Sequence, residues 1–584
     1  METDIQKTIK NISAVEKVKE NSNSLRGTIA SELENDDPKF SNEASQILKF
    51  HGIYTQDNRD SRSTRLKAGL EIEHLVMARV SIPGGRISSE QYLALNQIAN
   101  DLGNSTLRLT TRQGIQFHFV TKQDVRELLS RINETLLTTW GGCGDVIRNV
   151  TACPNVEDPR VKTVVERVAN EISNRYKAPS DAYFEFWIDG EKVAESISGA
   201  KTQERSIYRA NMLPRKFKIG VVSSIDNCID VLSHDLGIVV DNENSQIIRL
   251  YAGGGLGRSG TDESTFARLG DLLGEIDIES LFAFTDAIIE LQRDLGDRND
   301  RAHARLKYLI ARIGVDEFRR LVEEKVDIRF QPAEKDLFLA TNDHLGLTRN
   351  KFNNSYALGI KLPSGRIADT APINHRTAIS TIVQRYRPNL AVTAKGDLIL
   401  TDLASEIAPN LQDDLEALGV PSLKRQKPIF VSSFACVALP TCGLALAESE
   451  RYLPTFLGQL QDRLELLGIG DDDIEVRMTG CPNGCARPYL AEIGIVGRTK
   501  KSYDIFLGSD REGTRLNQLF AEDVEKESIV DSLAPLLIAW RDERKESERF
   551  GDFIYRLERS RLTAYVPAPR RQRIKVSASS KESL

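Results

Sequence analysis

The sequence predicts an α+β protein built from a pseudo-twofold internal repeat. VSIPGGRIS at 80–88 returns as IKLPSGRIA at 360–368, and LRLTTRQGIQF at 107–117 returns as LAVTAKGDLIL at 390–400. Each copy has the pattern of a strand, a turn containing proline and glycine, a helical stretch and a second strand of alternating polarity. We therefore expect two mixed α/β halves that pack as one pseudosymmetric body.

Length and composition describe a protein of several domains. The 584 residues exceed what one hydrophobic core holds, and 40% hydrophobic and 28% charged residues are ordinary for a globular chain. The net charge of −6 argues against a dedicated nucleic-acid binder. The N-terminus lacks the apolar run of a secretion signal, and no apolar stretch is long enough to span a bilayer. We therefore expect no membrane contact and a cytoplasmic location.

Four late cysteines fall in two pairs. Five residues separate Cys436 from Cys442, and three separate Cys481 from Cys485. Four thiolates form a soft, closed ligand set that suits zinc or an iron–sulfur cluster. Structural zinc usually takes its ligands from knuckles of roughly two to four intervening residues and often recruits histidine, whereas no histidine follows position 375. The spacing therefore favours a 4Fe-4S cluster over zinc, and plain buried thiols would have no reason to be paired.

The first repeat copy carries polar side chains that the second copy lacks. Side chains alternate along a strand, so positions 108, 110 and 112 share one face, as do 116 and 118 further on. These residues are Arg108, Thr110, Arg112, Gln116 and His118. The matching residues of the second copy are Ala391, Thr393, Lys395, Ile399 and Thr401, and Arg79 is matched by Gly359. We expect the first copy to bind an anionic ligand and the second to serve as scaffold; arginines paired with surface carboxylates are the alternative.

The cysteine segments ACVALPTCGLALAESER and MTGCPNGCARPYLAE resemble the signature of the sirohaem and 4Fe-4S sulfite and nitrite reductase family. The similarity runs from about Leu25 to about Tyr555, and PTCGLALAESER resembles the sulfite-reducing branch. By this resemblance all four cysteines hold the cluster, Cys485 also bridges to the sirohaem iron, and Asn483 can donate to cluster sulfur. The carboxylates of sirohaem would account for the polar face of the first copy.

The resemblance also implies a ring of cations over the open face of the sirohaem. These cations are Arg79, Arg148, Lys216 and Lys218. LPRKFK places the two lysines on one strand face and turns Phe217 to the other. Such a ring would bind sulfite, stabilise developing charge and relay protons. A solvated edge strand, whose lysines block further pairing, is the alternative for this stretch.

The glycine-rich stretch YAGGGLGRSG follows a strand-like pattern. Gly253, Gly254 and Gly255 are expected to let the backbone approach the macrocycle or its carboxylates. GLGRSG at 255–260 also satisfies the G-x-G-x-x-G pattern of dinucleotide sites. The chain further on predicts more helix instead of the second strand of a βαβ unit, which weighs against that alternative. Residues 291–310 predict a basic helix.

The remaining histidine and cysteine signals are interpreted as structural. His51 is expected to be a packed or capping imidazole and not a ligand. Cys143 and Cys153 are expected to be buried, unreactive thiols, and Cys228 has no assigned role. The expected segments are a partly extended lead-in at 1–73, paired ferredoxin-like repeat halves at 74–139 and 341–425, a sirohaem and substrate domain at 140–340, a cluster domain at 426–565 and a disordered basic tail at 566–584.

The resemblance implies an enzyme, a sulfite reductase haemoprotein of assimilatory type. It would take sulfite to sulfide by six electrons, with sirohaem and a 4Fe-4S cluster as cofactors. Electrons are expected from ferredoxin or a separate flavoprotein; GGCGD before Arg148 and GTRLNQ at 513–518 resemble the ferredoxin-dependent members more. The alternatives are a nitrite reductase, a non-catalytic iron–sulfur electron-relay or assembly protein, and a zinc-stabilised binding module.

Overall fold

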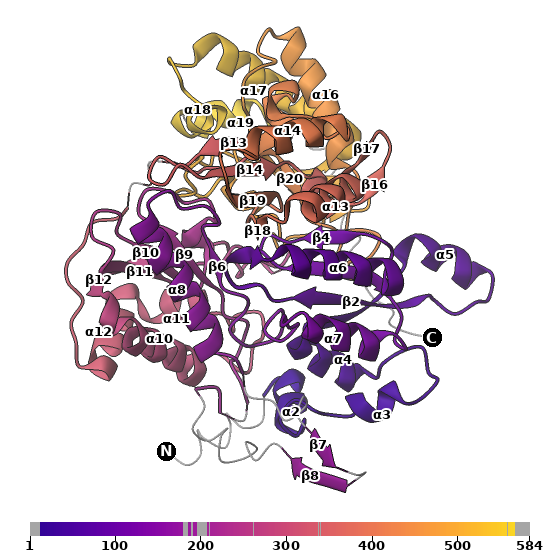
Figure 1. Cartoon of the computed structure of the whole chain (residues 1–584). Helices are drawn as coiled ribbons and strands as arrows, with labels where there is room; N and C mark the ends of the chain where they lie inside the picture. Colours follow the sequence, from indigo (N-terminus) through magenta and orange to yellow (C-terminus); the bar gives the residue numbers. More distant parts are fainter. Residues whose placement is uncertain are drawn as a thin grey trace, which may run out of the picture.

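The computed structural model describes residues 12–178, 185–188, 191–195, 207–209, 211–260, 262–336, 338, 340–557 and 559–566. Within these ranges the chain forms four five-stranded sheets and two small two-stranded ones, with helices packed around them (Figure 1). The two small sheets pair β16 (Asp369–Thr370) with β17 (Ile373–Asn374) and β7 (Glu185–Ile188) with β8 (Glu191–Glu195). The predicted tail lies outside the described residues except for Val566. No described helix is long and apolar enough to cross a bilayer.

The first repeat half forms a sheet with the strand order β1-β2-β5-β4-β15. Its elements are β1 (Ile53–Asp57), β2 (His74–Val80), β5 (Ile115–Val120), β4 (Leu107–Leu109) and β15 (Arg366–Ile367), with helices α6 (Ser89–Leu102) and α7 (Val125–Glu134). α6 begins at a capping box: the Ser88 hydroxyl accepts from Gln91 N–H at 3.2 Å, and Gln91 Oε1 accepts from Ser88 N–H at 3.0 Å.

The second repeat half has the same plan, with the order β13-β14-β19-β18-β3. Its elements are β13 (Gly346–Arg349), β14 (Tyr356–Ile360), β19 (Leu398–Leu403), β18 (Asn389–Val392) and β3 (Arg86–Ile87), with helices α13 (His375–Tyr386) and α14 (Ala408–Ala417). Each half thus lends a short strand to the other: β3 pairs with β18, and β15 pairs with β4. This exchange confirms the predicted pseudo-twofold repeat.

Glycines allow the two halves to approach closely where they exchange strands. A Cβ atom on Gly85 would lie 2.5 Å from the Val392 carbonyl oxygen, and one on Gly365 would lie 2.5 Å from the Leu109 carbonyl oxygen. Both glycines also have positive φ angles, of 75° and 83°. Any larger residue would push the halves apart, so the Pro-Gly turns of the repeat serve the pseudo-twofold contact.

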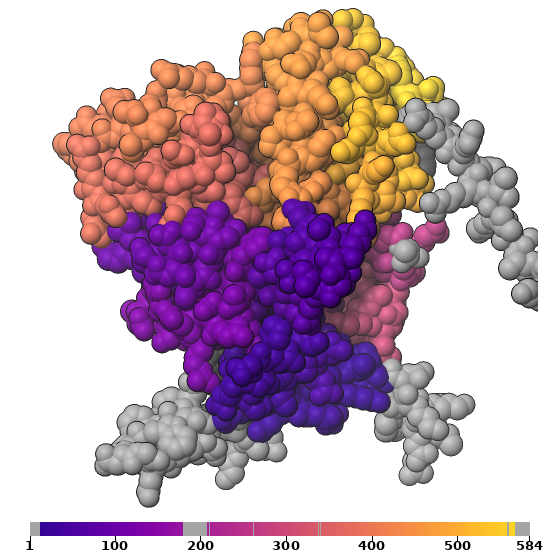
Figure 2. All heavy atoms as spheres, turned by 90° about the vertical axis from the view of Figure 1, so that its right-hand side faces the viewer, coloured from indigo at the N-terminus to yellow at the C-terminus, as the bar shows by residue number. Residues whose placement is uncertain are grey.

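The N-terminal segment packs against these sheets. It contains α2 (Ala14–Glu20), α3 (Ile29–Leu33), α4 (Asn42–Leu48) and α5 (Arg59–Lys67), and β1 pairs antiparallel with β2. Leu48 and Ile53 are buried in the core of the repeat halves, whereas Leu25, Ile47 and Phe50 are buried in the core of the middle domain described next. Figure 2 shows most of this segment in indigo on the side of the molecule opposite the C-terminal domain in orange and yellow, whereas α5 reaches that domain, where Arg59 Nη1 donates to the Ala445 carbonyl at 2.7 Å.

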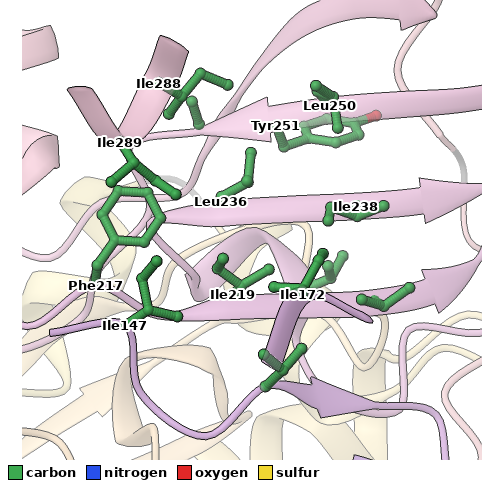
Figure 3. Packing of buried hydrophobic residues seen from close by; sticks show 14 of the residues in the cluster. Ile147, Ile172, Phe217, Ile219, Leu236, Ile238, Leu250, Tyr251, Ile288 and Ile289 are labelled. Atoms are coloured by element: carbon green, nitrogen blue, oxygen red, sulfur yellow. The ribbon is translucent and has the colours of Figure 1, made fainter. Parts of the chain in front are cut away.

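The middle of the chain forms the third sheet, in the order β12-β11-β10-β9-β6. Its elements are β12 (Asp271–Asp277), β11 (Ile247–Ala252), β10 (Leu236–Val240), β9 (Ile219–Ser223) and β6 (Thr151–Ala152), with helices α8 (Pro159–Arg175), α10 (Leu281–Leu295), α11 (Leu306–Ile313) and α12 (Val315–Val326). Phe217 lies in the core of this domain together with Ile147 and Ile289 (Figure 3). Because Phe217 is fully buried, Lys216 and Lys218 face the other side, as predicted.

The C-terminal domain contains the fourth sheet. Its elements are β20 (Phe434–Ala435), β21 (Val476–Thr479), β22 (Ile493–Thr499), β23 (Ser502–Leu507) and β24 (Gln518–Glu525), with helices α15 (Pro428–Ser432), α16 (Leu453–Leu466), α17 (Ile529–Glu543), α18 (Phe550–Arg556) and α19 (Arg559–Ala564). Pro454 lies in the first turn of α16, where its missing N–H costs no hydrogen bond. Phe456, Leu460 and Leu464 are buried at helical spacing.

Two local predictions are wrong. The second strand of the first copy ends at Leu109, so Thr110 and Arg112 lie in the following turn, where the Thr110 hydroxyl accepts from Arg112 N–H at 3.3 Å and Gly114 N–H at 3.1 Å. The basic helix expected at 291–310 is interrupted between α10 and α11. The backbone turns at Gly296, where a Cβ atom would lie 2.4 Å from the Gln292 carbonyl oxygen.

Candidate active site

The four late cysteines gather where two parallel strands end. Cys436 directly follows β20, and Cys481 follows β21 after one residue. Because β20 and β21 are parallel neighbours, their carboxyl ends bring both cysteines to one edge of the sheet. Cys442 and Cys485 lie in the turns that come next; Cys442 N–H donates to the Ala438 carbonyl at 2.9 Å. Cys485 is exposed, whereas Cys481 is buried.

The cysteine sulfur atoms accept hydrogen bonds, and the charge of one thiol shifts the pKa of the others. Gly480 N–H donates to Cys436 Sγ at 3.4 Å, and Asn483 Nδ2 donates to Cys481 Sγ at 3.6 Å. Burial and then the charge of Cys485 raise the pKa of Cys436 and Cys442, and raise the pKa of Cys481 to about 12. Cys485 is thus within electrostatic reach of the other three thiols. Because the charge of Cys485 raises the pKa of the other three thiols, four thiolates here need a bound metal charge to be stable, which fits an iron–sulfur cluster.

Arg79, on β2, lies within electrostatic reach of Cys485 and Cys442, and its Nη1 donates to Cys143 Sγ at 3.4 Å. Burial lowers its pKa, but the charges of Cys143, Tyr54, Cys485 and Cys442 more than offset this and leave the pKa raised. Gln116 on β5 positions the guanidinium: with the amide oxygen turned toward it, Oε1 accepts from Nη2 at 2.6 Å and from Nε at 3.1 Å.

Lys216 and Lys218 add two half-buried ammonium groups. Burial lowers the pKa of both lysines well below the usual range, and neighbouring cations lower it further. Arg305 acts on both lysines, whereas Cys485 partly opposes the effect on Lys216. In the described part of the chain neither lysine forms an ion pair with a carboxylate. An anionic ligand is the partner that such a group of cations lacks.

Arg148 and Arg112 lie in the same neighbourhood. Arg148 N–H donates to the Phe217 carbonyl at 2.8 Å, which ties this residue to the segment of the two lysines just before β9, and its Nε donates to the Gly144 carbonyl at 2.7 Å. Burial and then Arg148 lower the pKa of Arg112 to about 9. Among the described residues, Arg112 Nε and both ring nitrogens of His118 are buried without a hydrogen-bond partner. These unsatisfied polar atoms fit a carboxylate-rich cofactor.

The second repeat copy has no such unpaired groups at the matched positions. Lys395, which matches Arg112, lies 2.5 Å from Asp343 Oδ1 and 2.8 Å from Glu475 Oε1. At Gly359, which matches Arg79, a Cβ atom would lie 1.9 Å from the His344 carbonyl oxygen, so no side chain fits there. The contrast supports the interpretation of one ligand-binding copy and one scaffold copy.

The guanidinium group of Arg108 binds other groups of the protein. Its Nε donates to Glu450 Oε2 at 3.1 Å, and Nη2 donates to the Ala435 carbonyl at 2.8 Å. Arg366, at the matching position of Arg86 in the second copy, donates to Glu450 Oε1 at 2.8 Å. Glu450 therefore joins both repeat halves to the cysteine domain. Arg108 helps to hold these parts together and does not point its charge at a ligand.

The three consecutive glycines also meet protein atoms. Cβ atoms on Gly253, Gly254 and Gly255 would lie 2.4 Å from Arg268 Nη1, 2.2 Å from the Leu232 carbonyl oxygen and 2.5 Å from Arg305 Nη1. The loop then reaches the cysteine turn, where Arg258 N–H donates to the Pro482 carbonyl at 3.1 Å. β11 pairs antiparallel with β12 and no helix lies between them among the described residues, so the G-x-G-x-x-G pattern lacks the strand-turn-helix setting of a dinucleotide site.

Two buried ion pairs near the site were missed from the sequence. Arg487, two residues after Cys485, binds Asp230 and donates to the carbonyls of Thr111 at 3.3 Å and Ala394 at 3.0 Å. It thereby links the turns of both repeat copies to the cysteine loop, and its place beside the cysteine pair was a usable signal. Arg305 binds Asp235 at 3.1 and 2.6 Å, and no local pattern connects these two residues.

The four cysteines and the cations near them fit a redox protein that holds an iron–sulfur cluster beside an anion-binding site. Residues 71–135 match the family model described as the nitrite/sulfite reductase ferredoxin-like half domain, and residues 168–330 match the one described as the nitrite and sulphite reductase 4Fe-4S domain. The chain is 39% identical over 565 residues to the sulfite reductase [NADPH] hemoprotein beta-component of Myxococcus xanthus, which covers 96% of this chain and 98% of the relative. It is 38% identical to the protein of the same name from Acidithiobacillus ferrooxidans, over 94% of this chain and 96% of the relative.

The solved structure of the Mycobacterium tuberculosis NirA protein has a similar fold. Its TM-score is 0.75 at 23% identity, and the match covers 95% of this chain and 98% of that one. Given the relatives above, this chain belongs to the nitrite and sulfite reductase family, which confirms the resemblance seen in its sequence.

Proposed function

We propose that this protein is a sulfite reductase that takes sulfite to sulfide by six electrons, with sirohaem and a 4Fe-4S cluster as its cofactors. Cys436, Cys442, Cys481 and Cys485 would hold the cluster, and Cys485 would also bind the iron of the sirohaem. The proposal is supported above all by the position of Cys485, whose charge acts both on the other three thiols and on Arg79 and Lys216. When bound, the two cofactors supply electron storage and transfer.

Four cations of the chain then bind and protonate the substrate. Arg79, Arg148, Lys216 and Lys218 offer positive charge to the sulfite dianion, and Gln116 keeps the Arg79 guanidinium in place. Because the pKa of each lysine is lowered, its Nζ gives up a proton more readily than an ordinary lysine. Lysine Nζ groups can therefore protonate the oxygens that leave as water. The side of the site that would hold the sirohaem is proposed to consist of Arg112, Gln116, His118, Gly253, Gly254 and Gly255. Thr110 and Arg108 are proposed to support these residues.

The electron donor is proposed to be a separate flavoprotein that oxidises NADPH. The two relatives named above carry the name of an NADPH-dependent hemoprotein beta-component, which favours a flavoprotein alpha-component as partner. Ferredoxin, favoured by the GGCGD and GTRLNQ motifs, is the alternative. We further propose a cytoplasmic location, where thiols stay reduced.

Turnover of the purified holoenzyme tests the function. With reduced methyl viologen as donor, we expect stoichiometric sulfide from sulfite and a higher kcat/KM for sulfite than for nitrite. Preference for nitrite would instead assign the nitrite branch of the family. No turnover of either anion by protein with both cofactors would reject the enzymatic role. Replacing viologen by an NADPH-flavoprotein or by reduced ferredoxin then identifies the donor.

A further inference from the structure

A second group of metal-ligating side chains lies outside the active site. Cys153, Asp226, Cys228 and His344 each offer one ligand atom, and these four atoms lie within 4.8 Å of one another. Both cysteines are buried, as are the side chains of Asp226 and His344. The redox centre uses none of these residues, so their convergence needs its own explanation.

We propose that Cys153, Asp226, Cys228 and His344 bind one zinc ion as a tetrahedral structural site. Two thiolates, an imidazole and a carboxylate form a ligand set that suits zinc. The site is separate from the four-cysteine cluster, and the proposal does not depend on which anion the enzyme reduces.

The distances between ligand atoms agree with a shared tetrahedral ion. Bond lengths of about 2.3 Å to sulfur and about 2.1 Å to nitrogen and oxygen separate a sulfur–nitrogen pair by about 3.6 Å and a nitrogen–oxygen pair by about 3.4 Å. In the structure Cys153 Sγ lies 3.5 Å from His344 Nε2, and His344 Nε2 lies 3.4 Å from Asp226 Oδ2. One ring nitrogen carries at most one hydrogen and could reach both atoms only through a weak three-centre bond, whereas a cation between the three atoms satisfies all of them.

The charge of Asp226 also calls for a cation. Its side chain is buried, and Asn342 contributes the two neutral donors that reach it, N–H and Nδ2, each at 3.1 Å. Within the described ranges no lysine or arginine forms an ion pair with it, and its contact with a basic side chain is the one to His344, itself one of the four ligands. A buried carboxylate beside two cysteines is costly unless positive charge is present, and a divalent ion supplies that charge.

The backbone holds the ligands in position before any ion binds. Cys153 N–H donates to the Val221 carbonyl of β9 at 3.1 Å. The turn that carries Asp226 and Cys228 is tied to the segment before β13: Ala340 N–H donates to the Ile225 carbonyl at 3.0 Å, and Asn227 N–H donates to the Ala340 carbonyl at 3.0 Å. Ligands preorganised in this way bind a metal without a large ordering cost.

The ion would connect the middle domain to the second repeat half and to the active site. His344 precedes β13, and its carbonyl packs against Gly359 of β14. Asp230, two residues after Cys228, forms an ion pair with Arg477 at 2.6 Å and also binds Arg487, close to Cys485. Zinc would therefore fix the turn whose Asp230 positions Arg487. Loss of zinc should make the position of Arg487 less well defined without removing a cluster ligand.

Elemental analysis of the purified holoenzyme tests the proposal. We expect about one zinc per chain beside the iron of the redox centre, and a zinc-edge X-ray absorption spectrum with two sulfur and two nitrogen or oxygen neighbours. Cys228→Ser and His344→Gln should lose most of the zinc. His375→Gln changes another buried histidine outside the group and should keep it. If Cys228→Ser does not fold, the nearly isosteric Asp226→Asn replaces it.

Three results would overturn the proposal. Zinc could be absent from a folded holoenzyme that carries its full iron. The intact mass under non-reducing conditions could be lower by two hydrogens because Cys153 and Cys228 form a disulfide. Zinc could also be surrounded by four sulfur atoms, which would place it in the cluster ligands. The zinc content of Cys485→Ser distinguishes the last result from the proposal, because zinc at the proposed site stays bound in that variant.

Discussion

Arg112 and Lys395 occupy matched positions in the two repeat copies, yet only Lys395 has carboxylate partners. Its ammonium lies 2.5 Å from Asp343 and 2.8 Å from Glu475, whereas Arg112 has a buried Nε without an acceptor in the described part of the chain. An unpaired buried cation costs stability and is retained where a ligand completes it. Substituting a cation of the first copy should therefore affect ligand binding and turnover more than folding.

Lys216→Met tests the substrate side of the site. We expect kcat for sulfite to fall about a hundredfold, because a charge that stabilises the transition state is lost. Sirohaem and iron content should stay unchanged. Lys545→Met, at an exposed lysine far along the chain, is the control. Lower cofactor content with full turnover of the remaining holoenzyme would instead assign Lys216 to the carboxylates of the cofactor.

Cys485→Ser tests the bridging ligand. We expect the magnetic coupling between haem and cluster iron to disappear from Mössbauer and electron paramagnetic resonance spectra, since the shared thiolate is gone. Cys143→Ser alters a buried thiol outside the ligand set and should leave the coupling intact. An unchanged coupled spectrum in Cys485→Ser would contradict the ligand assignment.

Among the secondary-structure elements, the paired strands β4 and β15 share one carboxylate as the counter-charge of their arginines. Glu450 receives Arg108 from β4 and Arg366 from β15, and it lies in the same segment as Cys442. Glu450→Gln leaves two nearly buried guanidinium groups without their counter-charge. We expect a loss of about 3 kcal/mol in the free energy of unfolding, measured as a lower urea midpoint. Glu448→Gln, which breaks a more exposed pair with Arg451, should cost less than about 1 kcal/mol.

The short helix η1 (Lys49–His51) gives the fold a defined acid sensitivity. The Nε2–H of His51 donates to the Leu25 carbonyl at 2.8 Å, and its ring lies 4.8 Å from that of Trp140, which confirms the packed imidazole predicted from the sequence. Burial lowers the pKa of His51 to about 4. The unfolded chain binds this proton near pH 6.5 and the folded chain does not, so stability falls as pH drops from about 6.5 to about 4, by about 3 kcal/mol.

His51→Gln should remove this part of the pH dependence. Urea midpoints measured between pH 7 and pH 4 should fall less steeply in the variant than in the parent. His303→Gln should not flatten the curve, because His303 is partly exposed and its hydrogen bond to Asp300 raises its pKa instead of lowering it. Parallel curves for parent and His51→Gln would show that His51 takes up its proton in the folded state.

For the molecule as a whole, local signals were predictable and distant partnerships were not. The repeat and the cysteine pairs each lie within short stretches of sequence, so the pseudo-twofold body and the candidate cluster ligands could be predicted. The exchange of β3 and β15 and the pairing of Arg305 with Asp235 join residues far apart in the chain with no pattern to mark them. The turn at Thr110 was missed because alternation along a strand does not reveal where the strand ends.

A coupled sirohaem and 4Fe-4S centre has a fixed composition, so counting its iron and sulfide shows whether the protein holds it. Iron, acid-labile sulfide and the absorption spectrum should be measured on the purified protein from a host that makes sirohaem. We expect about five iron and four sulfide per chain together with sirohaem bands. Cluster iron and sulfide without the macrocycle would contradict the account, and would leave the unpaired cations of the first repeat copy without a ligand.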